Sequence, residues 1–517
     1  MELAQLIKTP SKTEIDPREQ LDILFAASEI APFSKTGGLG DVAASLPKAI
    51  VGQGHRVSVI TPLHGHLDPK TLHLSRRLTT LSVPRKGKVQ SKVEATVWET
   101  RNIEGVRIFF IEQEEFFGRD GIYGYDGDEF DDNAARFSFF SRAIVEFAIQ
   151  MSVPVDVIHC NDWHTALAPV YRDHYYAEEL EDTSVVLTIH NLAYQGKFDG
   201  ELIDQTGLPK KFYKEDELRD GDDINFLKGG IRHADTITTV SPTFAEEITT
   251  EEGGFGLHGL FEERSDDLHG VLNGADYSIW SPEHDTYLDV QYDIEGLNGK
   301  RRNKAELQHD FSLPIRPTMP LLAFVGRLAD QKGLDILIPA VQELLEGIES
   351  EREGFQLLFL GEGSEEYADQ LHALEERFPK RVGVHIGYSE GLAHRFQAGA
   401  DMLLIPSKYE PCGLTQLYAM RYGTLPIVHA TGGLADTVSD PGDDQSLSSG
   451  FVFDEYTPEA LRDTITRACK RYSNYRKWRP LMETAMKEDF SWDESARKYA
   501  DIYKLSTTHR NAETDDE

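Results

Sequence analysis

The sequence predicts an α/β protein that consists of two doubly wound domains in one chain. Apolar runs of strand length alternate with amphipathic helical stretches, and the same alternation starts again in the second half. The length of 517 residues allows two to four domains of about 150 residues each. We therefore expect an N-terminal domain at residues 21–271, a linker at 272–286 and a C-terminal domain at 287–488.

A strand–loop–helix–strand unit opens the first domain. Residues 21–28 and 55–63 are apolar runs, and residues 41–53 between them place Val42 and Leu46 on one helical face. The other strands of this half are predicted at 106–111, 155–160, 185–190 and 235–240. Continuous apolar runs of this kind are typical of parallel sheets that are covered on both faces.

The second half repeats the pattern without repeating the sequence. Its strands are predicted at 321–326, 356–361, 382–387, 401–406 and 424–430, and two of its helices at 334–348 and 458–472. Residues 1–20 and the acidic tail at 506–517 are predicted to be flexible, solvated ends.

Charge and cysteine content exclude several classes of function. The 88 acidic and 53 basic side chains give a net charge of −35, which argues against a nucleic-acid or anionic-membrane partner. The three cysteines, Cys160, Cys412 and Cys469, are too few and too scattered for a disulfide framework or a zinc site. With no secretory signal and no apolar run of about 18 residues, we expect a cytoplasmic protein.

Each domain begins with a strand followed by a loop that is rich in glycine and basic residues. These loops are SKTGGLGD at 34–41 and GRLADQKG at 326–333. In open α/β sheets, ligands bind beyond the carboxyl ends of the strands, where backbone N–H groups can bind phosphate. Neither loop is a Walker A or a G-x-G-x-x-G motif, so each one alone could be an ordinary turn. Two of them, one in each domain, favour a bilobal protein with a phosphate-type site.

Longer motifs then resemble one family of enzymes. The motifs are KTGGLGDV (35–42), HCNDWHTAL (159–167), TIHNLAYQG (188–196), LNGADYSIW (272–280), FVGRLADQKG (324–333) and PSKYEPCGLTQLYAMRYGTLPIV (406–428). On these residues the chain resembles the bacterial glycogen and starch synthases of glycosyltransferase family 5, from about residue 21 to 505.

The resemblance implies a GT-B fold, in which two Rossmann-like domains face each other across a cleft. It implies retaining transfer of glucose from ADP-glucose to the non-reducing 4-hydroxyl of an α-1,4-glucan, the glycogen or starch acceptor. It also implies that residues 489–505 form a helix that crosses back to the N-terminal domain. No cofactor, PLP or metal is expected.

The resemblance also assigns roles to individual residues. The expected catalytic residues are His190, Arg327, Lys332 and Glu410. The expected donor-binding residues are Lys35, Gly37, Gly38, Arg327, Lys332, Glu410, Cys412, Gly413 and Thr415, with Cys412 and Gly413 at the start of a helix. The expected sugar or acceptor side consists of Asp162, His190, Asn191 and Asn273.

Two of these residues have an ordinary structural alternative. Asp162 could be the N-cap of the helix that follows it, and Asn273 could simply form a turn before Gly274. The Asp-Gly-Asp at 126–128 is interpreted as a solvated loop, because it lies far from both phosphate loops in sequence. The segment PLHGHL at 62–67 departs from the family pattern and leaves local acceptor contacts open.

Retention of configuration raises the question of a nucleophile. A double displacement needs a carboxylate on the face of the sugar opposite the leaving group. The sequence shows no dedicated pair of carboxylates, so we favour same-face attack, with the departing phosphate accepting the proton. The alternatives are a UDP-glucose-dependent synthase and a catalytically silent glucan-binding homologue. A PLP-dependent phosphorylase shares only the architecture.

Overall fold

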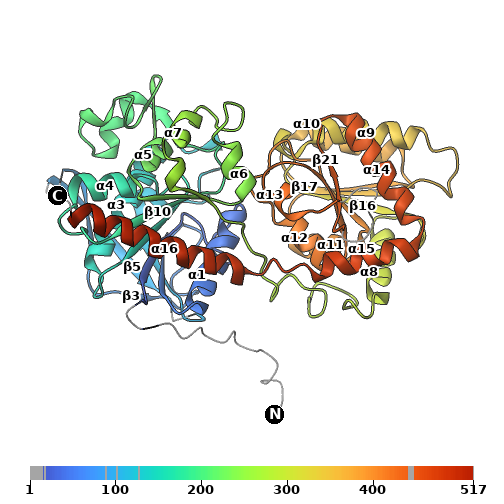
Figure 1. Cartoon of the computed structure of the whole chain (residues 1–517), viewed down its shortest axis with the longest axis horizontal. Coiled ribbons are helices and arrows are strands. Elements are labelled where there is room, and N and C mark those ends of the chain that lie inside the picture. Colours follow the sequence, from blue (N-terminus) through green and yellow to red (C-terminus); the bar gives the residue numbers. More distant parts are fainter. Residues whose placement is uncertain are drawn as a thin grey trace, which may run out of the picture. The chain divides into compact units, whose positions relative to one another are not determined.

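The computed structural model describes residues 16, 19–87, 90–100, 103–125, 128–440 and 448–515. The chain divides into two compact units (Figure 1). Unit 1 consists of Met1–Val240, Ala245–Gly274 and Trp492–Glu517, and unit 2 of Ser241–Phe244 and Ala275–Ser491. Most of the N-terminal extension predicted at 1–20 lies outside the described residues.

Unit 1 is built on a sheet whose central strands are parallel. In spatial order they are β15 (Leu268–Gly270), β14 (Thr236–Thr239), β10 (Ser184–Ile189), β9 (Val157–Asn161), β1 (Asp22–Ala26), β2 (Arg56–Pro62) and β6 (Arg107–Glu112). Six of these strands lie close to the predicted positions, whereas β15 was not predicted. Most of the side chains of the six strands are buried because helices cover both faces.

Antiparallel strands that the sequence reading missed extend this sheet. β5 (Gln90–Glu99) runs antiparallel to β6, and β3 (Ser75–Arg76) and β4 (Leu81–Lys86) pair with β5. Buried Val93, Ala95 and Val97 alternate with more exposed residues along β5, which is the pattern of a strand with one solvated face. The unit is therefore not purely doubly wound.

The remaining elements of unit 1 surround the sheet. The helices are α1 (Gly38–Gly52), α2 (Glu114–Phe117), α3 (Asn133–Gln150), α4 (Leu167–Tyr175), α5 (Phe226–His233) and α7 (His258–Glu263). The small sheets are β7 (Gly124–Tyr125) with β8 (Asp128–Glu129), and β11 (Lys197–Asp199) and β12 (Arg219–Asp220) on either side of β13 (Asp223–Asn225). Single 3₁₀ turns occur at Gly200–Thr206, Lys210–Phe212 and Ser265–Asp267.

The last helix, α16 (Trp492–Asp515), belongs to unit 1 and lies beside α1 (Figure 1). Its Tyr503 hydroxyl is 2.7 Å from Nδ1 of His159, and its Ser506 hydroxyl bonds the hydroxyl of Ser184. The prediction of a helix ending at 505 with a disordered tail from 506 was wrong. The helix continues because Ser506 is buried against β10, which the acidic composition of the tail does not reveal.

Unit 2 contains a six-stranded, fully parallel sheet. Its spatial order is β18 (Val382–Ile386), β17 (Gln356–Gly361), β16 (Leu321–Val325), β19 (Met402–Ile405), β20 (Leu425–His429) and β21 (Phe451–Phe453). The helices are α8 (Asn298–Asp310), α9 (Leu334–Glu346), α10 (Glu365–Arg377), α11 (Glu390–Gly399), α12 (Thr415–Arg421), α13 (Gly432–Thr437), α14 (Pro458–Tyr472) and α15 (Tyr475–Lys487). A 3₁₀ turn occupies Asp330–Lys332, and α6 (Pro242–Glu247) begins in unit 2 and ends in unit 1.

The predicted linker at 272–286 is mostly part of unit 2, which begins at Ala275. The Trp280 ring stacks between His394 and Tyr418, with centroid distances of 3.7 and 4.1 Å. Asp285 accepts hydrogen bonds from Nδ1 of His394 (2.7 Å) and from the Tyr422 hydroxyl (2.5 Å). These partners lie more than 100 residues away, so the local pattern of small and polar residues predicted a linker instead of packed structure.

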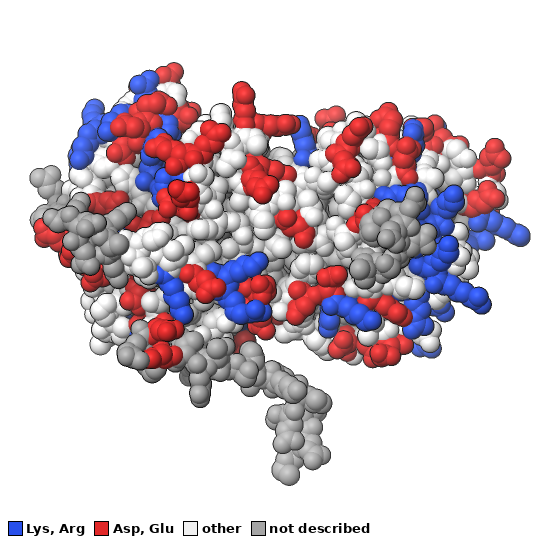
Figure 2. Space-filling model, viewed as in Figure 1, with Lys and Arg blue, Asp and Glu red and all other residues white. Residues whose placement is uncertain are grey.

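The surface carries the acidic excess seen in the sequence. Figure 2 shows Asp and Glu over both units, with Lys and Arg gathered more densely at the right of the view, over unit 2. No helix in the described part of the chain is long and apolar enough to cross a membrane.

Candidate functional site

In unit 1, candidate residues lie where three neighbouring parallel strands end. β1, β9 and β10 are adjacent in the sheet, and the loops that follow them contain Lys35, Asp162 and His190 respectively. On either side of β1 the connections run in opposite directions, toward β2 and toward β9. Open α/β sheets bind their ligands at such a switch point.

Asp162 joins the end of β9 to the end of β10 through hydrogen bonds. Its carboxylate accepts a hydrogen bond from the backbone N–H of His190 at 2.7 Å, and its own N–H donates to the Thr188 carbonyl at 2.9 Å. Its φ of 57° lies in the left-handed region, which is unusual for a residue other than glycine. The N-cap alternative is wrong, because α4 begins at Leu167 and the carboxylate is engaged on the β10 loop.

Burial raises the pKa of Asp162 to about 7, and the charge of Glu29 adds to this effect. The backbone N–H groups of His190 and Asn191 oppose it by donating to the carboxylate. The Asn191 side chain instead accepts a hydrogen bond from the N–H of Ala193 at 3.1 Å. Asp162 is therefore a carboxyl group that titrates near neutral pH.

His190 is a neutral imidazole at physiological pH. Burial lowers its pKa to about 3, and its Nε2 lies 2.9 Å from Oδ1 of Asn161. Asn161 in turn donates to the Ala26 carbonyl at 3.0 Å, which fixes the amide. Asn161 is a residue that the sequence reading missed, although it stands in the HCNDWH motif directly before Asp162.

The glycine loop of unit 1 differs from the prediction. Its Lys35 forms an ion pair with Asp41 at 2.7 Å. The N–H groups of Thr36 and Gly37 donate to the carboxylate of Glu29 at 2.5 and 3.3 Å. The Gly37 N–H group thus already has a carboxylate partner in the same chain, and donor binding by Gly37 stays a prediction. Gly38 is the first residue of α1.

Asn273 is buried in unit 1, and its Oδ1 has no hydrogen-bond partner among the residues that the structure describes. The following Gly274 is required by packing, since a Cβ there would lie 2.7 Å from the backbone of Trp492 in α16. The structure thus explains the glycine through its packing against α16.

In unit 2, a largely buried ion pair joins the two principal motifs. Nζ of Lys332, in the loop after β16, is 2.6 Å from Oε2 of Glu410, in the loop after β19. The two side chains are 21% and 9% exposed, and the Ser407 hydroxyl also donates to Glu410 at 2.9 Å. Arg327 is more exposed, and its guanidinium donates to the Gln331 side chain at 2.7 Å.

Glycines make this approach of two loops possible. A Cβ at Gly333, whose φ is 74°, would lie 1.9 Å from the carbonyl oxygen of Pro406. A Cβ at Gly432 would lie 2.1 Å from the carbonyl oxygen of Glu410. The Gln331 carbonyl accepts a hydrogen bond from the N–H of Lys408 at 2.9 Å. The motifs at 326–333, 406–413 and 431–438 therefore form one packed assembly.

The helix expected at Cys412 starts later. α12 begins at Thr415. It cannot extend back to Cys412, because Gly413 has a φ of 73°, which is not helical. The buried Cys412 and Gly413 form a turn whose carbonyls accept hydrogen bonds from the Gln416 side chain at 3.0 and 3.1 Å. The residues predicted to bind the donor are adjacent, but Cys412 and Gly413 are not helical.

Tyr388 was missed by the sequence reading. It follows β18 at the same carboxyl edge of the unit 2 sheet, and 67% of its side chain is exposed. An exposed aromatic ring at the carboxyl edge of a parallel sheet is a surface on which a planar ligand can stack. Its position directly after a strand was the available signal.

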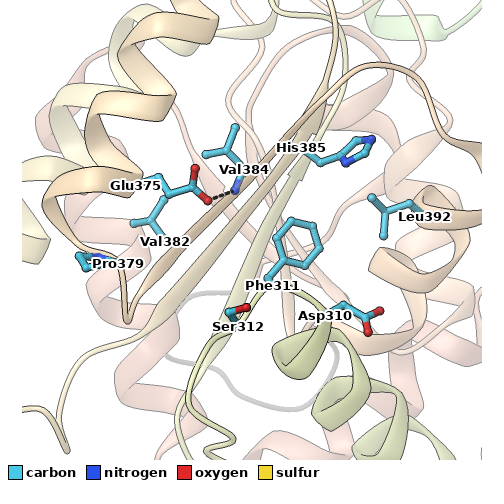
Figure 3. Close-up of a pocket in the computed structure, with 9 residues that line it drawn as sticks. All are labelled: Asp310, Phe311, Ser312, Glu375, Pro379, Val382, Val384, His385 and Leu392. Atoms are coloured by element: carbon cyan, nitrogen blue, oxygen red, sulfur yellow. Dashed lines mark hydrogen bonds between the residues drawn. The ribbon is translucent and has the colours of Figure 1, made fainter.

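A separate concavity of about 520 Å³ lies at the β18 side of unit 2 (Figure 3). Phe311, Val382 and Leu392 provide apolar walls, and Glu375 accepts a hydrogen bond from the Val384 N–H at 3.0 Å. None of the predicted site residues lines it. The concavity is therefore distinct from the Lys332–Glu410 site.

Among the described residues, no group of three or more His, Cys, Asp or Glu side chains is arranged to hold a metal ion. Within the predicted Asp-Gly-Asp segment, residues 126 and 127 lie outside the described residues, and Asp128 is exposed in β8. The absence of a metal requirement stays a prediction.

The fold and the two groups of residues define a two-domain α/β glycosyltransferase. The model of the starch synthase catalytic domain matches residues 22–263, and the model of group 1 glycosyl transferases matches residues 306–480. The chain is 43% identical to a glycogen synthase of Anaeromyxobacter sp. (strain Fw109-5), over 94% of this chain and 99% of that one. A glycogen synthase of Koribacter versatilis is 40% identical over 94% and 98%. The chain belongs to the glycogen and starch synthase family.

Solved structures agree with this assignment. The catalytic domain of starch synthase IV from Arabidopsis thaliana, bound to ADP and acarbose, superposes with a TM-score of 0.85 at 34% identity. The match covers 95% of this chain and all of that one. A sucrose-phosphate synthase from Thermosynechococcus elongatus, at 16% identity and a TM-score of 0.57, shares the fold.

Proposed function

We propose that this glycosyltransferase uses ADP-glucose and extends an α-1,4-glucan at its non-reducing 4-hydroxyl with retention of configuration. The proposal rests on one observation, the ion pair between Lys332 and Glu410 at the carboxyl edge of the unit 2 sheet. The starch synthase IV structure supports the choice of ligands, because that protein is bound to ADP and to acarbose.

The unit 2 residues suit a nucleotide-sugar donor. Lys332 and Arg327 are proposed to neutralise the charge that develops on the departing diphosphate, the usual task of fixed cations in such reactions. Glu410 is proposed to accept hydrogen bonds from the sugar hydroxyls while it holds the Lys332 ammonium in place. The Tyr388 ring is proposed to stack on the nucleobase.

The unit 1 residues suit the sugar and the acceptor. His190 is neutral, so it can exchange hydrogen bonds with hydroxyl groups without placing positive charge beside the reacting carbon. Asp162 and Asn273 are proposed to bind sugar hydroxyls on the same side. That Lys35 acts on the same donor as the unit 2 cations stays a prediction.

The contacts of the carboxylates support same-face attack. Asp162 accepts a backbone hydrogen bond from His190, and Glu410 accepts from Lys332 and Ser407. In the proposed step the C1–O bond to the diphosphate breaks and a C1–O bond to the acceptor forms on the same face. The acceptor proton passes to a phosphate oxygen. A trapped glucosyl adduct on Asp162 or Glu410, seen by rapid quench and mass spectrometry, would contradict this mechanism.

The test is incorporation of labelled glucose into glycogen from ADP-glucose or UDP-glucose, in the presence of a chelator. We expect label from ADP-glucose and at least about tenfold less from UDP-glucose, a discrimination of about 1.4 kcal/mol. Preference for UDP-glucose would overturn the donor assignment. No label from either donor would overturn the proposed enzyme activity and leave a glucan-binding homologue.

A further inference from the structure

A buried carboxylate lies at the centre of the glycine loop of unit 1. Glu29 lies three residues after the end of β1 and is 3% exposed. One of its carboxylate oxygens accepts hydrogen bonds from the N–H groups of Thr36 and Gly37. The other oxygen accepts from the Tyr123 hydroxyl at 2.9 Å, and the Thr36 hydroxyl is 3.2 Å from it. Four donors from two segments, residues 36–37 and Tyr123, therefore converge on one anionic group.

This arrangement is an anion-binding loop whose anion, the Glu29 carboxylate, belongs to the same chain. Successive backbone N–H groups that point to one side form a concavity for an anion, and phosphate loops use the same geometry. Burial raises the pKa of Glu29, while the donated hydrogen bonds lower it. Because the carboxylate already binds Thr36 and Gly37, the loop can offer a ligand its Lys35 side chain without offering those two amides.

Residues 28–34, which precede the glycine motif, also form hydrogen bonds with the segment at 62–67. Nε2 of His64 is 2.8 Å from the Ser28 carbonyl, and Nε2 of His66 is 3.1 Å from the Ser34 hydroxyl. The Ser28 hydroxyl is 2.7 Å from the hydroxyl of Tyr123. The PLHGHL segment, which departs from the family pattern, thus holds the same turn that Glu29 closes.

We propose that Glu29 is a positioning residue, which fixes the loop at 35–37 so that Lys35 is presented to the donor phosphates. The proposal rests on the proposed function for the role of Lys35, but not for the role of Glu29 in holding the loop. In this proposal Glu29 acts through the loop and not by contact with a substrate.

The kinetic test is a double-mutant cycle with Lys35. We expect Glu29→Ala to lower kcat/KM for ADP-glucose at least about tenfold, and Glu29→Gln to lower it less, because an amide oxygen can still accept from Thr36. In the Lys35→Ala background, adding Glu29→Ala should change kcat/KM by less than about twofold. Fully additive effects, or an unchanged kcat/KM in both Glu29 variants, would overturn the proposal.

A matched control separates positioning from stability. Asp235 is another carboxylate of unit 1 that accepts a backbone N–H, from Val185 at 2.6 Å, and it pairs with Arg172 at the amino end of β14. Asp235→Asn should lower the unfolding temperature without changing the donor KM. If Glu29→Gln behaves in the same way as this control, Glu29 is structural only and the proposal fails.

Hydrogen exchange gives a readout that does not depend on activity. In the wild-type protein, peptides covering residues 33–40 should exchange slowly, and Glu29→Gln should accelerate them at least about tenfold without affecting peptides from β9. Unchanged exchange in this segment would overturn the loop-holding role. If the wild-type protein transfers no glucose, the proposed function fails, and exchange alone still decides whether Glu29 holds the loop.

Discussion

The glycine loops of the two units look alike in sequence and are held in opposite ways. In unit 1, the carboxylate of Glu29 binds backbone N–H groups, and the loop lysine, Lys35, pairs with Asp41 at the surface. In unit 2, the carboxylate of the buried Glu410 binds the loop lysine itself, the half-buried Lys332. One loop is fixed through its backbone, and the other through its cation.

This difference changes the meaning of the glycines. Gly37 has an extended φ of −157°, and a Cβ there would meet nothing within 4 Å. Gly333 has a φ of 74°, and a Cβ there would collide with Pro406. A glycine-rich loop therefore indicates steric necessity in unit 2, but not at Gly37 of unit 1.

The largest effect is expected when the Lys332 ammonium group is removed. Lys332→Ala should lower kcat about 10²- to 10³-fold, as the loss of one fixed transition-state contact usually does. It also leaves the buried Glu410 charge without its ion-pair partner. Steady-state kinetics with ADP-glucose measure the effect. Lys408→Ala is the control, because this exposed lysine bonds the loop only through its backbone. A Lys332→Ala variant that keeps more than about a tenth of wild-type kcat would contradict the role of the cation.

Alanine at the two glycines tests the steric half of the comparison. Gly333→Ala should destabilise unit 2 by about 1–3 kcal/mol from the left-handed φ alone, and by more because of the collision with Pro406. Gly37→Ala should cost less than about 1 kcal/mol, the loss of a glycine N-cap. Differential scanning calorimetry of both variants measures this. Equal shifts in unfolding temperature would show that the two loops are under the same constraint.

A further test concerns pH. The pKa of Asp162 is about 7 in the folded protein and 3.8 in its ordinary state, so the folded form retains a proton that the unfolded form has lost. The free energy of unfolding should therefore fall as pH rises from about 4 to about 7. Asp162→Asn stays neutral throughout, so its stability relative to wild type should rise over the same range and then level off. Unfolding temperatures at about pH 5 and about pH 8 test this, and a difference that does not change with pH would refute it.

Local patterns were sufficient for the central parallel strands, but not for the short edge strands β15 and β21. Strands such as 321–326 and 356–361 are continuous apolar runs, and the structure places β16 and β17 there. The same reasoning failed for 275–286 and for the end of α16, because Trp280 and Ser506 are held by residues far away in sequence.

In the candidate site, too, local motifs predicted single residues, whereas contacts between distant residues were not predicted. The motifs identified Lys332 and Glu410 individually, but the ion pair between residues 78 positions apart is a product of the tertiary fold. Glu29 carried no motif of its own, and only the turn between it and Thr36 reveals its role. For Asp162 the sequence left a sugar-side role and an N-cap open, and the carboxylate binds the β10 loop and not the helix that follows it.

The return of α16 to unit 1 also determines the order in which the molecule can be completed during synthesis. Every residue of unit 2 is translated before Trp492, so the sheet of unit 1 must wait for its last helix while unit 2 emerges. Until then, the face of α1 and the His159 ring lack the side chains of Tyr499 and Tyr503. The nascent chain therefore carries an exposed apolar surface on its first domain after its second domain is ready to fold.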